Sequence, residues 1–321
     1  MPPINQFKKI KRYGIVGIIP LIKHALKYYS TKYFTNKSFY KRNIYNYQLY
    51  LRISDPGLSR DLAVRGTREE QLKFIIDKEV TAGNVILDVG ANIGYYSIMI
   101  ANIVGNTGKV YALEPEPTNY NTLQKNISLN QLNHVIESYQ MGASDTNSPK
   151  PLYRSKYSNM HSFILPENDI IDMKNPKSHE EIKMINLTDF ILGKQPIDML
   201  RMDIEGYEVE VLSGLQKAIE KGTWRGKILF ECHFKRYTET HSIKDKLEFL
   251  FKNGYTTKYV TSTDERKPRI RNLGYQPIKT IQTNDTRFRG IYKNISDAHT
   301  LQLICNSGGV RDVLFEKITP N

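Results

Sequence analysis

The chain has 321 residues, of which 40% are hydrophobic, so it is long enough to bury one large core. Two widely separated cysteines, Cys232 and Cys305, exclude a disulfide framework and a zinc-finger pattern and favour a reducing, cytoplasmic compartment. The formal net charge is +13, but ten Lys and Arg residues lie in residues 1–50, which contain no Asp or Glu, so the body of the chain is close to neutral.

The first 50 residues are interpreted as a basic, aromatic arm. A basic start followed by an apolar run at 14–22 has the outline of a signal peptide, but the run is too short to span a bilayer and contains Pro20. No small-residue cleavage site follows, so we expect the segment to stay uncleaved. Lysines interspersed with tyrosines suit an anionic membrane surface, and a solvated or self-packed extension is the alternative.

After residue 50, short apolar runs alternate with amphipathic segments. The predicted strands are 84–89, 109–115, 134–140, 197–203, 227–232, 255–262 and 287–293, and the predicted helices are 66–80, 95–104, 117–130, 207–222 and 242–254. This alternation predicts an α/β fold with a doubly wound, mostly parallel sheet that binds its ligand at the carboxyl ends of the strands. We expect one main domain at 51–295, with a substrate-side insertion at 155–182, a second loop at 263–285 and a C-terminal tail at 296–321.

Residues 85–97 read VILDVGANIGYYS, which predicts a strand, a glycine turn and a buried helix. Asp88 stands where it would repel a dinucleotide's pyrophosphate, and the G-x-x-x-G spacing differs from the dinucleotide fingerprint. A carboxylate attracts a cation, and S-adenosyl-L-methionine (SAM) carries both an ammonium and a sulfonium group. A purely structural turn is the alternative. The predicted cofactor turn consists of Asp88, Gly90, Ala91, Asn92 and Gly94.

The next two strands also end in acidic residues. Glu114 ends the second strand, where a neighbouring acid can accept hydrogen bonds from the two ribose hydroxyls of a nucleoside. Asp145 follows the third strand, in GASD, and is assigned to the adenine edge, although an ordinary turn explains it nearly as well. Both residues are therefore predicted to bind the cofactor.

Four segments resemble the FkbM family of SAM-dependent methyltransferases: VILDVGANIGYYS, YALEPEPTNYNTLQKNISLN, IDMLRMDIEGYEVEVLSG and ILFECH. The resemblance covers about residues 51–293 and implies a class I methyltransferase fold, with a seven-stranded sheet whose last strand is antiparallel. It also implies methyl transfer from SAM, usually to a hydroxyl of a sugar or natural product. By position, the family's motifs correspond to Asp88, Gly90, Gly94, Glu114, Asp203, Glu205 and Gly206. Cys232 departs from the family pattern, because an apolar residue is expected between Glu231 and His233.

An aliphatic hydroxyl is a poor nucleophile until a base accepts its proton, and the base must lie where the fourth and fifth strands end. Asp203, Glu205 and His233 are the catalytic candidates. His233 is preferred because histidine has the ordinary pKa nearest neutrality, and Asp203 or Glu231 can orient it; a surface histidine is the alternative. Asp203 and Glu205, with Glu208, also resemble part of a Mg²⁺ site, but a clear third ligand is missing, so we predict no metal.

The sequence therefore predicts a cytoplasmic SAM-dependent O-methyltransferase acting on a sugar, a glycolipid or a related hydroxyl-bearing acceptor, with peripheral membrane contact through residues 1–50. An RNA methyltransferase is an alternative, disfavoured by the near-neutral body. A catalytically silent module with the same fold is a second alternative. The joint presence of Asp88, Glu114, Asp203 and His233 disfavours it.

Overall fold

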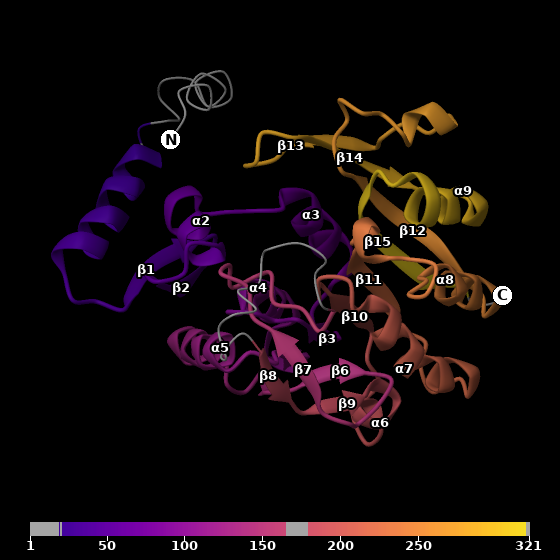
Figure 1. The fold of residues 1–321 in the computed structure, drawn as a ribbon, viewed down its shortest axis with the longest axis horizontal. Helices are drawn as coiled ribbons and strands as arrows, with labels where there is room; N and C mark the ends of the chain where they lie inside the picture. Colours follow the sequence, from indigo (N-terminus) through magenta and orange to yellow (C-terminus); the bar gives the residue numbers. More distant parts are fainter. Residues whose placement is uncertain (1–18, 20, 165–178, 319–321) are drawn as a thin grey trace.

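The computed structural model describes residues 19, 21–164 and 179–318. Within these residues, a nine-stranded mixed sheet runs through the molecule and carries helices on both faces (Figure 1). The parallel strands β3, β4, β5, β10 and β11 meet at one carboxyl edge. In spatial order the sheet contains β13 (Lys279–Gln282), β14 (Phe288–Lys293), β12 (Tyr255–Ser262), β15 (Val310–Lys317), β11 (Lys227–Glu231), β10 (Met199–Met202), β3 (Val85–Val89), β4 (Lys109–Leu113) and β5 (Ile136–Tyr139).

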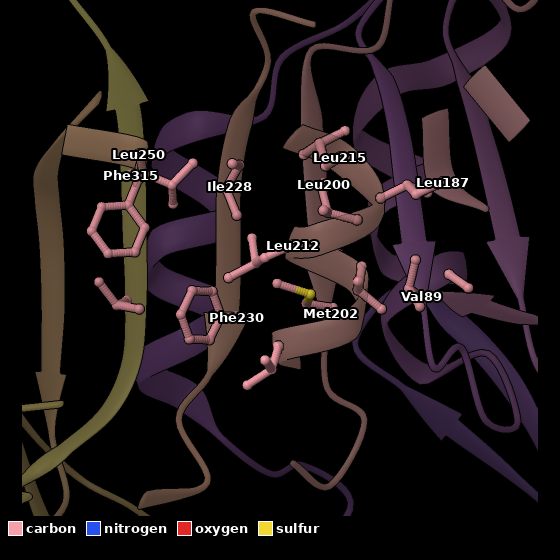
Figure 2. Close-up of a cluster of buried hydrophobic side chains, with 14 of the residues drawn as sticks. Val89, Leu187, Leu200, Met202, Leu212, Leu215, Ile228, Phe230, Leu250 and Phe315 are labelled. Atoms are coloured by element: carbon pink, nitrogen blue, oxygen red, sulfur yellow. The ribbon is translucent and has the colours of Figure 1, made fainter. Parts of the chain in front are cut away.

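Alternate residues of the central strands pack into two hydrophobic clusters. Leu87 belongs to one cluster and Ile86 to the other, as expected for a strand buried on both faces. Figure 2 shows part of the first cluster, where Leu212 and Leu215 of α7 face Leu200 of β10.

The helices are α2 (Leu58–Arg65), α3 (Glu70–Glu79), α4 (Tyr95–Val104), α5 (Pro117–Leu129), α6 (Leu187–Ile191), α7 (Glu208–Glu220), α8 (Lys244–Lys252) and α9 (Asp297–Leu301), which continues into a π-helix at Gln302–Ser307.

The strand order explains how the predicted sheet differs from the observed one. The seven strands from β5 to β12 include a last strand, β15, that runs antiparallel between β11 and β12, as the family resemblance implies. The α/β fold class is therefore confirmed. The predicted count of seven is too low for this chain, because β14 and β13 extend the sheet beyond β12.

The expected C-terminal tail at 296–321 is wrong for most of its length. Residues 310–317 form β15, which is buried in the middle of the sheet. Two charged residues, Arg311 and Asp312, interrupt its apolar pattern and hide the strand from a sequence reading. Asp312 is fully buried, and its Oδ2 accepts hydrogen bonds from Thr261 and Gln71, which offset part of the cost of burying this carboxyl group.

The boundary of the N-terminal arm at residue 50 also needs correction. The hairpin of β1 (Phe39–Ile44) and β2 (Tyr47–Arg52) packs against α5, and both of its strands contribute buried side chains to the second hydrophobic cluster. Asn126 accepts a hydrogen bond from the backbone N–H of Tyr50, and Asn130 accepts one from that of Gln48. Residues 39–50 therefore belong to the folded domain.

The polar insertion predicted at 155–182 lies only partly within the described residues, because 165–178 are outside them. Residues 155–164 cross the carboxyl edge of the sheet. Two small sheets flank this segment: β7 (Lys150–Tyr153) with β8 (His179–Ile182), and β6 (Gly142–Ser144) with β9 (Met184–Asn186). The second predicted loop, 263–285, contains a 3-10 turn and β13. Among the described helices, none combines the length and the apolar character needed to cross a bilayer.

Candidate active site

The glycine turn forms between β3 and α4, as the sequence predicts. Gly90 has a φ of +80°, and a Cβ there would lie 2.3 Å from the backbone oxygen of Asp203, so only glycine fits this approach of β3 to the end of β10. The N–H groups of Gly90 and Ala91 donate to Leu113, and that of Gly94 donates to Ala91. A small space of about 50 Å³ adjoins the turn, enough for one or two water molecules.

Asp88 is fully buried beneath this turn. Its carboxylate accepts a hydrogen bond from Ser97 at 2.5 Å and forms an ion pair with Arg201 at 3.1 Å. Arg201 is also buried, stacks on the ring of Tyr96 and reaches Asp203 at 3.3 Å. The expectation that Asp88 itself meets a cationic ligand therefore needs correction, because an arginine from β10 already neutralises it.

Glu114 lies at the end of β4 and is 4% exposed. Its two oxygens accept the backbone N–H groups of Asn92 and Glu116, at 2.7 and 2.9 Å. Burial raises the pKa of Glu114 to about 8. The position next to the turn suits a ribose contact, but the carboxylate is covered in this structure.

The segment around Ser158 covers the ends of β3 and β4. The side-chain amides of Asn92 and Asn119 both donate to the backbone oxygen of Ser158, each at 2.9 Å. The hydroxyl of Ser158 donates to Asp55 at 2.7 Å. We call this arrangement the Ser158 clasp. It lies next to Glu114, which accepts the backbone N–H of Asn92.

Asp145 lies apart from the turn. It is exposed just after β6, and its carboxylate accepts a hydrogen bond from Ser144. Its backbone oxygen accepts a hydrogen bond from the side-chain amide of Asn186. Neither it nor its side-chain partner lines the space beside Gly90. The geometry here is that of the ordinary turn which the sequence leaves as the alternative.

The three catalytic candidates come together at the ends of β10 and β11. His233 Nε2 lies 3.8 Å from Asp203, 3.6 Å from Glu205 and 3.5 Å from Glu231. On the other side of the ring, Nδ1 contacts Glu208 at 2.9 Å, at the start of α7. His233 is therefore a half-buried ring, 11% exposed, among four carboxylates rather than a surface histidine.

These carboxylates change the acid–base properties of the ring. Burial disfavours the charged imidazole, but the negative charges of Glu208, Glu231 and Glu205 outweigh it and raise the pKa of His233 well above its usual value. Burial raises the pKa of Glu205 to about 7, against the attraction of His233. The surrounding carboxylates thus favour the protonated imidazole, and Glu205 is the carboxyl group of the cluster whose pKa lies near neutral pH.

Asp203, Glu231 and His233 place three ligand atoms within 4.8 Å of one another, a spacing that a metal ion also requires. Two arginines compete for the same carboxylates. Arg311 contacts Glu231 at 2.6 Å, and Arg201 contacts Asp203 at 3.3 Å. Protein cations therefore neutralise the carboxylates that a metal ion would need.

Sequence reasoning missed two residues at the site. Glu69, just before α3, is buried and accepts hydrogen bonds from Arg68, Tyr96 and Arg311. It lines the space beside Gly90 together with Asp203. Glu69 and Arg311 are 242 residues apart in the chain and meet only through β15, so no local pattern indicates their contact.

A comparison with protein families decides the assignment. The sequence model described as "Methyltransferase FkbM domain" matches residues 88–257, just over half of the chain. The chain belongs to the FkbM methyltransferase family. Family membership makes SAM the cofactor, and the class I topology of the sheet agrees with it.

Individual relatives are similar over shorter stretches. Methyltransferase sdnD of Sordaria araneosa is 26% identical over 157 residues, which cover 41% of this chain and 60% of the relative. A tRNA(Phe) (4-demethylwyosine(37)-C(7)) aminocarboxypropyltransferase of Methanocaldococcus jannaschii is 46% identical over 52 residues, 16% of this chain and 20% of the relative. Among solved structures, M. jannaschii TYW2 in complex with AdoMet has a TM-score of 0.39 at 19% identity and covers 88% of each chain. The chain thus spans less than two thirds of the length of these curated relatives.

The residues at the carboxyl edge fit SAM in their chemistry. Glu114 would accept hydrogen bonds from a ribose, and Asp203 and Glu69 place carboxylates beside the turn, where an ammonium or sulfonium group would be stabilised. When bound, SAM supplies the methyl group. The Ser158 clasp must open to admit it, since the space beside the turn is only about 50 Å³.

Proposed function

We propose that the protein is a SAM-dependent O-methyltransferase whose acceptor is a sugar, a glycolipid or a related compound with a free hydroxyl. The observation that carries this proposal is the convergence of Asp203, Glu205 and His233 in one cluster, of which Asp203 lies beside the glycine turn. In the reaction the methyl–sulfur bond breaks, an oxygen–methyl bond forms, and the hydroxyl proton passes to a base. The cluster provides that base in a buried, positioned setting.

Glu205 is the proton acceptor in this proposal. The sequence favours His233, but an imidazole that is already protonated cannot accept another proton. Glu205, with its pKa of about 7, is ionised in a large fraction of molecules at neutral pH. His233 then stabilises the ionised carboxylate from 3.6 Å, and Glu208 holds the ring in place.

The RNA methyltransferase alternative has some support from the short similarity to a tRNA-modifying relative. Its weakness is the distribution of charge, because the body of the chain is close to neutral outside residues 1–50. A steep salt dependence of RNA binding that survives deletion of residues 1–38 would favour it. Cofactor binding without turnover on any acceptor would favour the silent module.

Cofactor selectivity tests the proposal first. In isothermal titrations of the purified chain, we expect saturable binding of SAM and of its demethylated product S-adenosylhomocysteine (SAH), and none of NAD. Carboxylates lie beside the turn, and the backbone N–H groups of Gly90 and Ala91 already donate to Leu113. These two N–H groups are therefore not available to bind the pyrophosphate of NAD. A radiolabelled methyl transfer assay on glycolipids and polysaccharide precursors then tests the acceptor class. Binding of NAD alone would contradict the proposal.

We also propose that the protein works in the cytoplasm at an anionic membrane surface. The helix at 21–34 exposes Ile22, Leu26 and Phe34, and lysines lie along it. Exposed apolar side chains with neighbouring lysines suit the boundary between lipid headgroups and acyl chains. The hairpin that follows ties this helix to the folded domain, and Tyr28 packs fully buried against it.

Vesicle co-sedimentation checks this membrane contact. Replacing Lys23, Lys27 and Lys32 by glutamine should weaken binding to phosphatidylserine vesicles by about 10²-fold, at about 1 kcal/mol per lysine. The control carries the same charge change on α8, at Lys244, Lys246 and Lys252, and should bind as the wild type does. Equal losses in both triple variants would show that only net charge matters.

A further inference from the structure

A cavity of about 480 Å³ lies next to the glycine turn. Its walls come from α2, the start of α3, residues 157–160, the loop after β13 and the start of β15. It shares Arg68, Glu69 and Asn159 with the small space beside Gly90, so the two are neighbours. A molecule in this cavity would therefore lie beside the glycine turn.

The cavity is unusually rich in arginine. Six arginines and three carboxylates line it. The arginines are Arg60, Arg65, Arg68, Arg287, Arg289 and Arg311. They come from three separate stretches of the chain, 60–68, 287–289 and residue 311, so only the fold brings these stretches together.

Part of this positive charge is neutralised within the cavity wall. Asp61 pairs with Arg65 at 2.7 Å. Glu69 contacts Arg68 at 2.5 Å and Arg311 at 2.9 Å, and Arg311 continues to Glu231, outside the cavity, at 2.6 Å. These groups balance one another.

The remaining charge is not balanced. Asp285 is shared between Arg289 at 2.9 Å and Arg287 at 3.6 Å. Arg60 forms no ion pair with any carboxylate of the described residues, and both Arg60 and Arg287 are exposed. The cavity therefore has an excess of two positive charges: one on Arg60 and one on the two arginines that share Asp285.

We propose that this cavity binds a phosphoryl group of the acceptor. Guanidinium groups bind tetrahedral oxyanions through paired hydrogen bonds, and an excess of two charges matches a phosphate dianion better than a single carboxylate. This inference rests on the proposed O-methyl transfer and narrows its acceptor to a phosphorylated compound. Arg60 and Arg287 determine that specificity.

Isothermal titration with pyrophosphate, inorganic phosphate and acetate, at constant ionic strength, tests the inference on the full chain. We expect saturable pyrophosphate binding, weaker phosphate binding and no acetate binding. The double variant Arg60→Gln/Arg287→Gln should weaken pyrophosphate binding by about tenfold or more. The double variant Arg60→Lys/Arg287→Lys, which keeps the positive charges, should retain part of the affinity. Arg225→Gln is the control, because Arg225 is exposed before β11, at the amino edge of the sheet.

SAH affinity, measured on the same samples, separates this inference from the proposed function. SAH binding with pyrophosphate binding that depends on Arg60 and Arg287 supports both. SAH binding without pyrophosphate binding overturns the inference and leaves the methyltransferase proposal standing. Equal weakening by Arg225→Gln, or acetate binding as tight as that of pyrophosphate, also overturns it. Absence of SAH binding by the wild-type chain would count against the proposed function instead.

Discussion

Replacing Glu205 by glutamine is expected to lower kcat by about 10²–10⁴-fold, the usual contribution of a general base. The amide keeps the size of the side chain but cannot accept the proton of the acceptor. The Kd for SAH should stay within about twofold of the wild-type value, since Glu205 does not line the space beside the glycine turn. Single-turnover methyl transfer and SAH titration measure the two quantities separately.

The pH profile adds a second readout to this variant. Glu205 accepts a proton only when it is ionised, and its pKa is about 7, so wild-type kcat/KM should fall about tenfold per pH unit below 7 and level off above it. This acidic limb should vanish in Glu205→Gln. Glu210→Gln is the matched control, because Glu210 lies on α7 and contacts His241 instead. An acidic limb that persists in Glu205→Gln, or turnover lost on treatment with EDTA, would move the role to another group.

Replacing Asp88 by alanine is expected to lower the free energy of unfolding by about 3–5 kcal/mol, because it leaves the buried Arg201 without its closest carboxylate. Asp203 contacts Arg201 from 3.3 Å but is itself partly exposed. Urea denaturation followed by circular dichroism measures the change. Asp77→Ala is the control: it removes an exposed carboxylate from an ion pair with Lys73 and should cost less than about 1 kcal/mol.

This experiment also separates the two interpretations of Asp88. The sequence predicts a residue that attracts the cofactor, whereas the structure contains a residue that neutralises a buried arginine. Unchanged stability together with a large loss of SAH affinity would restore the first interpretation. A loss of stability with little change in SAH affinity at a permissive temperature would support the second.

Local patterns predicted much of the site. The apolar run, the glycines and the buried helix of residues 85–97 require only neighbouring residues, and they form as expected. Asp203, Glu205 and His233 follow two predicted parallel strands, β10 and β11, so their meeting at one edge follows from the fold class.

Long-range contacts account for what the sequence left out. Arg311 enters the site from β15, a strand whose charged residues conceal it, and Glu69 has neighbours that only the folded chain supplies. The neutralisation of Asp88 depends on Arg201, more than a hundred residues away. The raised pKa of His233 depends on Glu208 at the start of α7, 25 residues earlier in the chain. Such partners determine the charge and the pKa of a group, and the spacing of residues in the sequence does not indicate them.

The Ser158 clasp connects the two ligand sites thermodynamically. Ser158 accepts a hydrogen bond from Asn92, whose backbone N–H donates to Glu114, while its neighbours Tyr157, Asn159 and Met160 line the arginine-rich cavity. If binding at the turn displaced Ser158, the cavity wall would move with it, and we would expect each ligand to change the affinity of the other. This coupling is reciprocal: the factor by which cofactor binding alters acceptor affinity equals the factor in the opposite direction. One short peptide segment thus makes the occupancy of each site depend on the concentration of both ligands.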